Sequence, residues 1–519
     1  MPAPRFAATL FAGLLLFPRI ASPETTLTIG VQGSPDTFLP PFSRSSTGAD
    51  VFRWIYTDLC EFEDDGLTPK PALARAWEES DDGRVVTFHL DTAARWHDGQ
   101  PVTSRDVVFT HELIADEATG STRRGNRESI ESVVAPDDST VVFAFSQATP
   151  YRFVDARSGS VLPAHLLESV PRESLASSEY ARAPIGSGPF RFSRAADDDF
   201  VELVAVRDHF RTPPRFDRLR FQVIPELTTQ IVMLQRGDLD VVRKVPREDR
   251  TRLAQNVDLR FYRVPSESYQ YVGWNLRNPR FQDARVREAL SLALDREEIC
   301  RVLDADAARP FVGPLGDHHW AFAADLARPH QDLEAAQRLL ADAGWSDSDG
   351  DGWLDREGEP FSFELLTNSE SQLRRDLAVL LQSAWARLGV RAEPQLFEYN
   401  TLIQTVLRRE YPDAFLLGQG SPARPRLDRL FHSRSIEHDF NVTSYSSPGV
   451  DAALDAAEAA RTREEALPLW QDVQRLLAAD RPLLWLITVD DVYGCRADVQ
   501  VEPDARDFFA RLPEWRIDR

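Results

Sequence analysis

The chain has 519 residues, of which 42% are hydrophobic and 27% charged, a composition typical of a folded globular protein. This length exceeds what one hydrophobic core usually organises, and we expect about three domains. The formal net charge of −22 argues against nucleic acid and anionic membrane surfaces as partners, because both attract positively charged protein faces.

The first residues are typical of an export signal. Arg5 precedes an apolar run, Phe6 to Phe17, that is too short to span a bilayer but fits the centre of a signal peptide. We expect a signal peptide over residues 1–22, the alternative being an N-terminal core helix. No cysteine precedes Cys60, so we expect no lipid anchor, and a protein exported to the periplasm.

The next elements are a strand from Thr26, a Pro-rich loop and a helix from Asp50 to Leu59. The stretch from Ala72 to Ile114 then predicts a helix-like run closed by Trp77, a turn, a strand over 85–90 and a second turn at 97–99. A helix follows at Thr103, with Asp106 as its capping-box partner.

Later segments alternate between strand and helix patterns. Residues 129–146 predict two strands, and Gly186 with Gly188 predicts a tight turn before another strand. Residues 216–242 read as strand, helix and strand, which is typical of a parallel α/β unit. Helices are predicted over 333–345, 377–390 and, as a pair, 444–479, followed by a buried strand over 483–489.

Several of these strings resemble one known family. ALARAWEESDDGRVVTFHL, PIGSGPFRF and YVGWNLRNPRFQDARVREALSLALDREEIC are similar to segments of the family-5 extracellular solute-binding proteins, the dipeptide, oligopeptide and nickel receptors of ABC importers. The resemblance runs from about Thr26 to Val489. It implies an α/β, class II periplasmic-binding-protein fold, with two hinged lobes that enclose the ligand and one additional domain. The boundaries it implies are 23–60, 185–272 and 485–519 for lobe I, 61–184 for the additional domain, and 273–484 for lobe II.

The resemblance also implies a function. We expect a monomeric receptor that captures a peptide-like or other small polar ligand between its two lobes, requires no cofactor, and delivers the ligand to an ABC permease in the inner membrane. It would not be an enzyme: no G-x-S-x-G or phosphate-loop motif occurs, and His111 to Ala115 fails the H-E-x-x-H pattern at its last position. A hydrolase or a chemosensory receptor on the same fold remains the alternative.

One acidic loop resembles a calcium-binding loop. Asp347, Asp349, Asp351 and Asp355 occupy positions 1, 3, 5 and 9, with Gly352 at position 6, but Gly358 replaces the glutamate expected at position 12. The loop therefore predicts at most a weak structural calcium site, the alternative being a surface turn.

A second loop bears on the ligand. In peptide-binding members, a Gly-Trp-x-x-Asp loop supplies the acid that pairs with the ligand's α-amino group. In the matching segment here, residues 418–422, Gln419 replaces the tryptophan and Pro422 replaces the acid. We therefore expect Gln419, Ser421, Arg424 and Arg426 to bind a ligand with an acidic or hydroxyl-rich end, such as a modified peptide, opine or oligosaccharide. The alternative is that both arginines are solvated or pair with Asp428.

Aromatic and histidine side chains complete the expected site. Trp274 and Trp320 are predicted apolar walls of the pocket, although core packing explains many tryptophans. Because adjacent histidines rarely face one metal, His318 and His319 are expected at the edge of the cleft and not as a nickel site.

Overall fold

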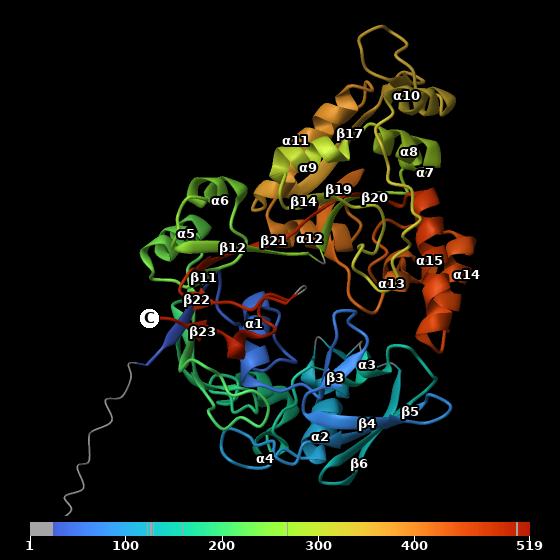
Figure 1. The fold of residues 1–519 in the computed structure, drawn as a ribbon. Coiled ribbons are helices and arrows are strands. Elements are labelled where there is room, and N and C mark those ends of the chain that lie inside the picture. Colours follow the sequence, from blue (N-terminus) through green and yellow to red (C-terminus); the bar gives the residue numbers. More distant parts are fainter. Residues whose placement is uncertain are drawn as a thin grey trace, which may run out of the picture.

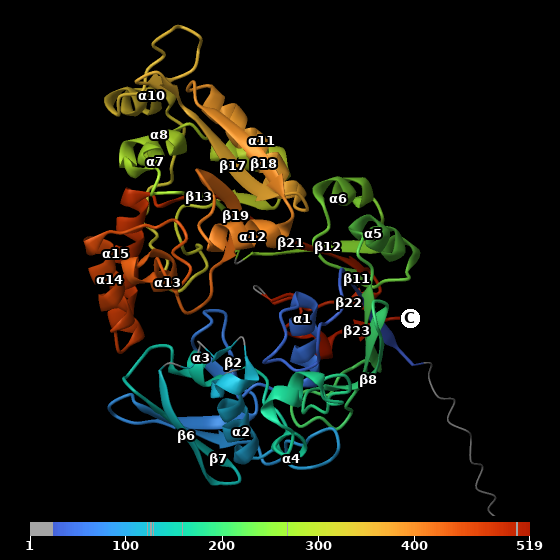
Figure 2. The same cartoon turned by 180° about the vertical axis from the view of Figure 1, so that it is seen from behind.

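The computed structural model describes residues 24–519, apart from residues 122, 125, 126, 128, 158, 267, 505 and 506. Two large β-sheets and one smaller sheet divide the described chain into lobe I, lobe II and an additional domain (Figures 1 and 2). The predicted signal peptide lies outside the described residues. Within the described part, no helix is long and apolar enough to cross a membrane.

Lobe I is built on a seven-stranded sheet assembled from three stretches of chain. Strand β1 pairs in parallel with β10 and β11, as the strand–helix–strand pattern predicted, and the other neighbours are antiparallel. Across the sheet the strands are β12 (Leu259–Val264), β21 (Asp491–Arg496), β11 (Val241–Val242), β1 (Thr26–Val31), β10 (Arg218–Val223), β9 (Phe200–Ala205) and β8 (Phe190–Ala196). The helices of this lobe are α1 (Ser46–Ile55), α5 (Leu227–Arg236) and α6 (Arg247–Leu253).

The additional domain has a four-stranded antiparallel sheet and a short hairpin. The sheet runs β4 (Ala74–Glu79), β5 (Val85–Leu90), β7 (Thr140–Phe145) and β6 (Ile130–Asp137), and the hairpin joins β2 (Cys60–Phe62) to β3 (Pro69–Pro71). Its helices are α2 (Ser104–Ala115), α3 (Arg152–Arg157) and α4 (Ala164–Leu167). Helix α2 ties this domain to lobe I, because Val107 packs in the domain's own core while Phe109 and Leu113 pack in the core of lobe I.

The prediction of a helix-like run ending at Trp77 is wrong. Residues 74–79 form strand β4, and Trp77 lies opposite Phe88 of β5. Alanine and glutamate favour a helix locally, but pairing with β5 and contact of the Trp77 ring with Phe153 at 5.6 Å determine the structure.

Lobe II is built on a six-stranded mixed sheet: β14 (Ala308–Pro310), β20 (Leu483–Val489), β13 (Ser268–Trp274), β19 (Ala414–Gly420), β17 (Ser362–Asn368) and β18 (Arg391–Phe397). Its helices are α7 (Pro279–Gln282), α8 (Ala284–Leu292), α9 (Arg296–Asp304), α10 (Leu333–Asp342), α11 (Gln372–Ala386), α12 (Tyr399–Leu407), α13 (Leu427–Phe431), α14 (Pro448–Glu458) and α15 (Arg463–Asp480). Two further two-stranded sheets are β15 (Asp355–Arg356) with β16 (Glu359–Pro360), and β22 (Val499–Gln500) with β23 (Arg516–Ile517).

Two predicted domain boundaries need correction. The boundaries at 272/273 and 484/485 cut through β13 and β20, but both strands lie entirely in the lobe II sheet. Lobe II therefore spans 268–489, and the chain crosses between lobes just before β13 and just after β20.

The glycines of the predicted turn at 186–188 have a different role. Neither Gly186 nor Gly188 has a positive φ. Instead, the Gly188 N–H donates to the Ile55 carbonyl at 2.8 Å, and a Cβ added to Gly186 would lie 1.8 Å from that oxygen. Glycine is required here for close backbone approach, which no pattern within the segment reveals.

Candidate functional site

Lobe II joins the rest of the chain through two neighbouring crossings. These crossings lie side by side, because β12 pairs with β21 in lobe I while β13 pairs with β20 in lobe II. Asp490 links them: its carboxylate accepts hydrogen bonds from the Ser266 N–H at 3.2 Å and from the Arg309 guanidinium at 2.9 Å. Two adjacent crossings of this kind form the predicted hinge.

A cavity of about 1190 Å³ lies between the three parts of the molecule. Lobe I contributes α1, Asp504 and residues from 507 to 514, the additional domain contributes the β2–β3 hairpin, and lobe II contributes residues from 309 to 319 together with Ser421 and Ala423. Pro265 and Ser266 of the hinge also line it. A cavity shared by both lobes and bounded by their hinge is placed to change shape when the lobes move.

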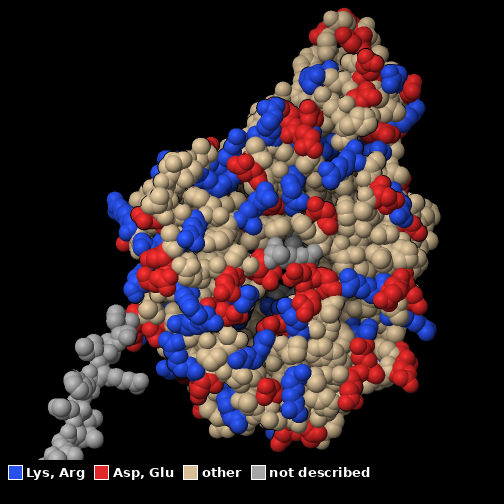
Figure 3. Space-filling model, in the orientation of Figure 1, with Lys and Arg blue, Asp and Glu red and all other residues tan. Residues whose placement is uncertain are grey.

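The lining carries more acids than cations. Figure 3 shows acidic and basic side chains gathered around the hollow at the centre of this face. The ten acidic residues of the lining are Asp50, Asp58, Glu61, Glu63, Asp64, Asp65, Asp317, Asp504, Asp507 and Glu514, and the six cationic residues are Arg53, Lys70, Arg157, Arg211, Arg309 and Arg511. Each of these six cations forms an ion pair with an acid of the same lining.

These pairs set the charge that a ligand meets. Arg157 lies 2.7 Å from Asp58; although burial alone raises the pKa of Asp58, this guanidinium and the Ser160 N–H hold it below its usual range. Asp58 therefore stays ionised and keeps Arg157 neutralised. The other five lining cations are paired in the same way. Of the four acids that remain, Asp50 lies 3.7 Å from Arg243 and Asp65 lies 2.6 Å from Arg463, both outside the lining, so the excess of acids over cations rests on fewer groups, Asp64 among them.

Asp64 stands out among the remaining acids. It is exposed at the tip of the β2–β3 hairpin and lines the cavity. Its neighbours are occupied, since Glu63 pairs with Lys70 at 3.5 Å and Asp65 pairs with Arg463 of α15 at 2.6 Å. Among the described residues, none forms an ion pair with Asp64, so its carboxylate is available to a ligand. None of the residues expected to bind ligand lies in this hairpin, although its sequence EFEDDG at 61–66 combines several acids with a turn glycine.

The cavity histidines are already engaged by the protein. His319 accepts the Ala321 N–H on Nδ1 at 3.0 Å, so its Nε2 carries the proton and donates to the Pro422 carbonyl at 3.1 Å. His209 lies 3.2 Å from the Ser187 carbonyl, and burial lowers its pKa to about 4, which keeps the imidazole neutral. His318 and His319 lie at the cavity edge, as expected.

The structure divides the predicted ligand loop. Gln419, Ser421 and Arg426 meet around a side pocket of about 40 Å³, and Ser421 also lines the main cavity. Arg424 does not face the cavity: its guanidinium binds Asp155 at 2.8 and 2.9 Å and Glu458 at 3.2 Å. The expectation that Arg424 offers its charge to a ligand is wrong, because two protein carboxylates hold it, and Asp428 is not its partner.

The two predicted aromatic walls also separate. Trp320 is half-buried beside the cavity and donates its indole N–H to the Ala423 carbonyl at 2.7 Å, so it supports the loop. Trp274 is fully buried in the lobe II core, with ring centroids 5.0 Å from Phe281 and 6.1 Å from Trp385. Trp274 is therefore a core residue and not a pocket wall.

The acidic loop lies in lobe II outside the cavity. One carboxylate oxygen each of Asp347, Asp349 and Asp351 lies within 4.8 Å of the others, close enough for all three to contact one metal ion. Asp355 does not join them, because its carboxylate accepts the Ser348 N–H at 2.9 Å and the Ser348 hydroxyl at 2.7 Å. Asp347 also accepts two backbone N–H groups, as in an ordinary acidic turn.

Comparisons with known proteins agree with this architecture. Residues 68–434 match the family model of the bacterial extracellular solute-binding proteins, family 5. The oligopeptide-binding protein AppA of Bacillus subtilis is 30% identical over 466 residues, which cover 89% of this chain and 85% of AppA. The chain belongs to family 5 of the extracellular solute-binding proteins. The resemblance seen in the sequence is thus confirmed.

Solved structures of the family carry the fold assignment. The structure of AppA from Bacillus subtilis in complex with a nonapeptide matches with a TM-score of 0.80 and 27% identity, over 96% of this chain and all of AppA. NikZ from Campylobacter jejuni, in complex with Ni(L-His), matches with a TM-score of 0.82 and 27% identity, over 95% of this chain and all of NikZ. These matches confirm the two-lobed fold with an additional domain.

Family membership fixes the class of function. The chain is an exported solute-binding protein that delivers its solute to an ABC importer, as the sequence predicted. The family consists of solute-binding proteins and not of enzymes.

Proposed function

We propose that this chain captures peptides with a free amino terminus in the cavity between its lobes and delivers them to an ABC permease of the inner membrane. The observation that carries the proposal is the acidic cavity wall, in which each of the six cations is paired with a lining acid and Asp64 is left available.

The size of the cavity supports a peptide. A volume of about 1190 Å³ exceeds the roughly 300–1,000 Å³ of ordinary small-molecule pockets. AppA, which shares the fold, holds a nonapeptide. A chain of several residues uses such a space better than a single opine or a nickel chelate does.

The charge of the cavity replaces the ligand chemistry predicted from the sequence. An acidic ligand end was expected from Arg424 and Arg426, but Arg424 is neutralised by Asp155 and Glu458. A negative wall instead favours an ammonium group, which can both pair with a carboxylate and donate hydrogen bonds to it. Asp64 then takes the role that the acid in the Gly-Trp-x-x-Asp loop has in peptide-binding relatives, but from the β2–β3 hairpin of the additional domain.

The location and partner follow from the same proposal. We also propose a monomeric receptor in the periplasm, since export is a property of the family and residues 1–22 have the pattern of a signal peptide. Fractionation should release the mature chain with the periplasm, without detergent. Retention in the membrane fraction or in the cytosol would contradict this part.

Calorimetry with defined peptides tests the ligand. Unmodified peptides of two to nine residues should bind, and acetylation of their amino groups should weaken binding tenfold or more, since a hydrogen bond to a charged group contributes about 1.5–3 kcal/mol. Asp64→Asn should weaken the unmodified peptides to a similar extent. The control is Asp81→Asn, an exposed acid of the same domain outside the cavity. Equal binding of acetylated and free peptides would reject the amino-terminal anchor.

A further inference from the structure

A buried ion pair joins lobe II to the additional domain. Arg424, in the loop after β19, binds both carboxylate oxygens of Asp155 on α3 at 2.8 and 2.9 Å. The Asp155 side chain is 2% exposed and that of Arg424 is 16% exposed. Both contacts come from one guanidinium nitrogen, Nη1, and such charge-assisted hydrogen bonds are stronger than neutral ones.

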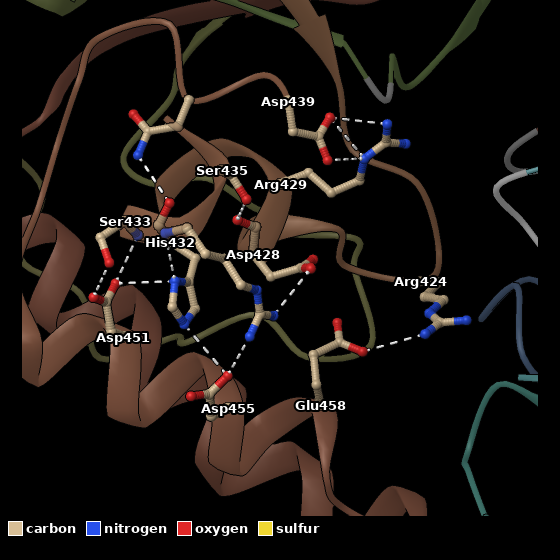
Figure 4. A network of polar contacts seen from close by, with 12 residues as sticks. Arg424, Asp428, Arg429, His432, Ser433, Ser435, Asp439, Asp451, Asp455 and Glu458 are labelled. Atoms are coloured by element: carbon tan, nitrogen blue, oxygen red, sulfur yellow. Dashed lines mark hydrogen bonds and ion pairs between the residues drawn. The ribbon is translucent and has the colours of Figure 1, made fainter. Parts of the chain in front are cut away.

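Each member of the pair also has a partner on its own side. Arg424 is held by Glu458 of α14 at 3.2 Å, a contact within lobe II that Figure 4 shows. Asp155 accepts the Ser129 hydroxyl at 2.6 Å within the additional domain. If the two domains separate, Arg424 keeps the carboxylate of Glu458, whereas Asp155 keeps only a hydroxyl donor and must be hydrated instead, so the contact favours the arrangement in which the pair is formed.

Other contacts cross the same boundary beside this pair. The Trp470 indole N–H of α15 donates to the Tyr151 hydroxyl at 2.6 Å, and the Arg424 guanidinium lies 4.9 Å from the centre of the Tyr151 ring. At the hairpin tip, a Cβ added to Gly66 would lie 2.7 Å from the Ala423 Cβ, so the two loops touch. Helices α14 and α15 therefore reach down to the additional domain on the side away from the hinge (Figure 1).

The connectivity of the chain makes this boundary a moving one. Lobe II is joined to lobe I by the two strand crossings, whereas the additional domain is fixed to lobe I through the shared helix α2. Rotation about the crossings therefore separates lobe II from the additional domain and pulls Arg424 away from Asp155.

We infer that Arg424 and Asp155 form a latch that stabilises the arrangement in which lobe II rests on the additional domain. Both are positioning residues, because neither lines the cavity. They act through the loop 421–424, whose Ser421 and Ala423 do line it and whose Ala423 carbonyl is held by Trp320. The latch depends on one part of the proposed function, namely that solute enters and leaves the cavity when the lobes separate.

The latch is tested without any peptide, so its failure is distinct from a failure of peptide binding. Spin labels at Val134→Cys in β6 and Val379→Cys in α11 report the distance between the additional domain and lobe II by pulsed electron paramagnetic resonance. Both positions are exposed, whereas Cys60, Cys300 and Cys495 are buried and should not label.

The labelled parent should show a population at the short distance of the contact arrangement. Asp155→Asn and Arg424→Gln should each lower the ratio of the short-distance to the long-distance population by about tenfold, and the double variant should add little, because both remove the same pair. The control is Asp325→Asn, which breaks the exposed Arg475–Asp325 pair within lobe II and should leave the distances unchanged.

Circular dichroism of each variant shows whether its fold is retained. Distance distributions of the latch variants that superimpose on the parent, or a parent without any short-distance population, would overturn the latch. Equal effects of the control and the latch variants would do the same.

Discussion

Replacing Asp106 by alanine tests the capping box that the sequence predicted at the start of α2. The predicted contacts are present: one Asp106 oxygen accepts the Thr103 N–H at 2.8 Å and the Thr103 hydroxyl at 3.3 Å. The structure adds two donors from elsewhere, the Trp96 indole N–H at 3.3 Å and the Ala164 N–H at 2.8 Å. Asp106 is 3% exposed, so it joins α2, the turn after β5 and the start of α4 inside the domain.

The expected loss follows from these contacts. Loss of an N-terminal cap lowers stability by about 0.5–2 kcal/mol. The Trp96 and Ala164 donors are left buried without an acceptor, at about 1–3 kcal/mol each. Because these contributions overlap, we expect Asp106→Ala to destabilise the additional domain by about 4 kcal/mol. Asp106→Asn retains one acceptor oxygen and should lose about half as much.

Denaturant unfolding followed by hydrogen exchange in α2 and β5 measures this loss, since several domains need not unfold together. Glu112→Gln, an exposed substitution on the same helix, is the control and should change stability by less than about 0.5 kcal/mol. A loss below about 1 kcal/mol for Asp106→Ala would show that the reasoning from buried donors is wrong.

Three further predictions concern other parts of the molecule. Calcium at ten times its Kd should stabilise lobe II by about 1.4 kcal/mol through the loop 347–351. If a chelator leaves Tm unchanged, the loop binds no calcium and is an ordinary turn. His97 accepts the Gly186 N–H on Nδ1 at 3.1 Å, and burial lowers its pKa to about 4; its stabilising contribution is therefore present above about pH 6.5 and lost as the pH falls from 6.5 to 4. The fall in Tm over this range should be shallower in His97→Gln, and an unchanged slope would contradict the assignment. Arg287, 6% exposed, donates to four backbone carbonyls, two at the end of α15 and two at the end of α7. Arg287→Met should therefore destabilise lobe II by about 3 kcal/mol in denaturant unfolding, whereas Arg301→Met at an exposed site should cause no measurable change.

Features with a local physical cause could be predicted from the sequence. Thr103 and Asp106 are three residues apart, so their capping box needs nothing beyond the helix itself. Gly344 and Gly389 lie at the ends of the helices predicted over 333–345 and 377–390, and both adopt the positive φ that is common after a helix. In each case the signal and the contact lie within one turn of chain.

Features that depend on distant partners could not be read in the same way. Strand β20 was recognised as a buried strand, but its apolar sequence cannot show which of two sheets it joins, and its assignment to lobe II moved a domain boundary. The partner of Arg424 is Asp155, 269 residues away, so a nearby acid such as Asp428 was the natural alternative and was wrong. Trp274 has the residue type of a pocket wall, and only its neighbours show that it lies in the core.

The hairpin tip shows why the ligand chemistry in particular escapes the sequence. Glu63, Asp64 and Asp65 are three consecutive acids, and nothing in their types or spacing distinguishes them. In the structure, Glu63 meets Lys70 across the hairpin, and Asp65 meets Arg463 from a helix 398 residues further along. Asp64 alone of the three remains open to the cavity, because neither cation reaches it. Which acid can receive a ligand is therefore decided by which cations the fold brings to its neighbours, so the charge a binding site presents is a property of the assembled lobes.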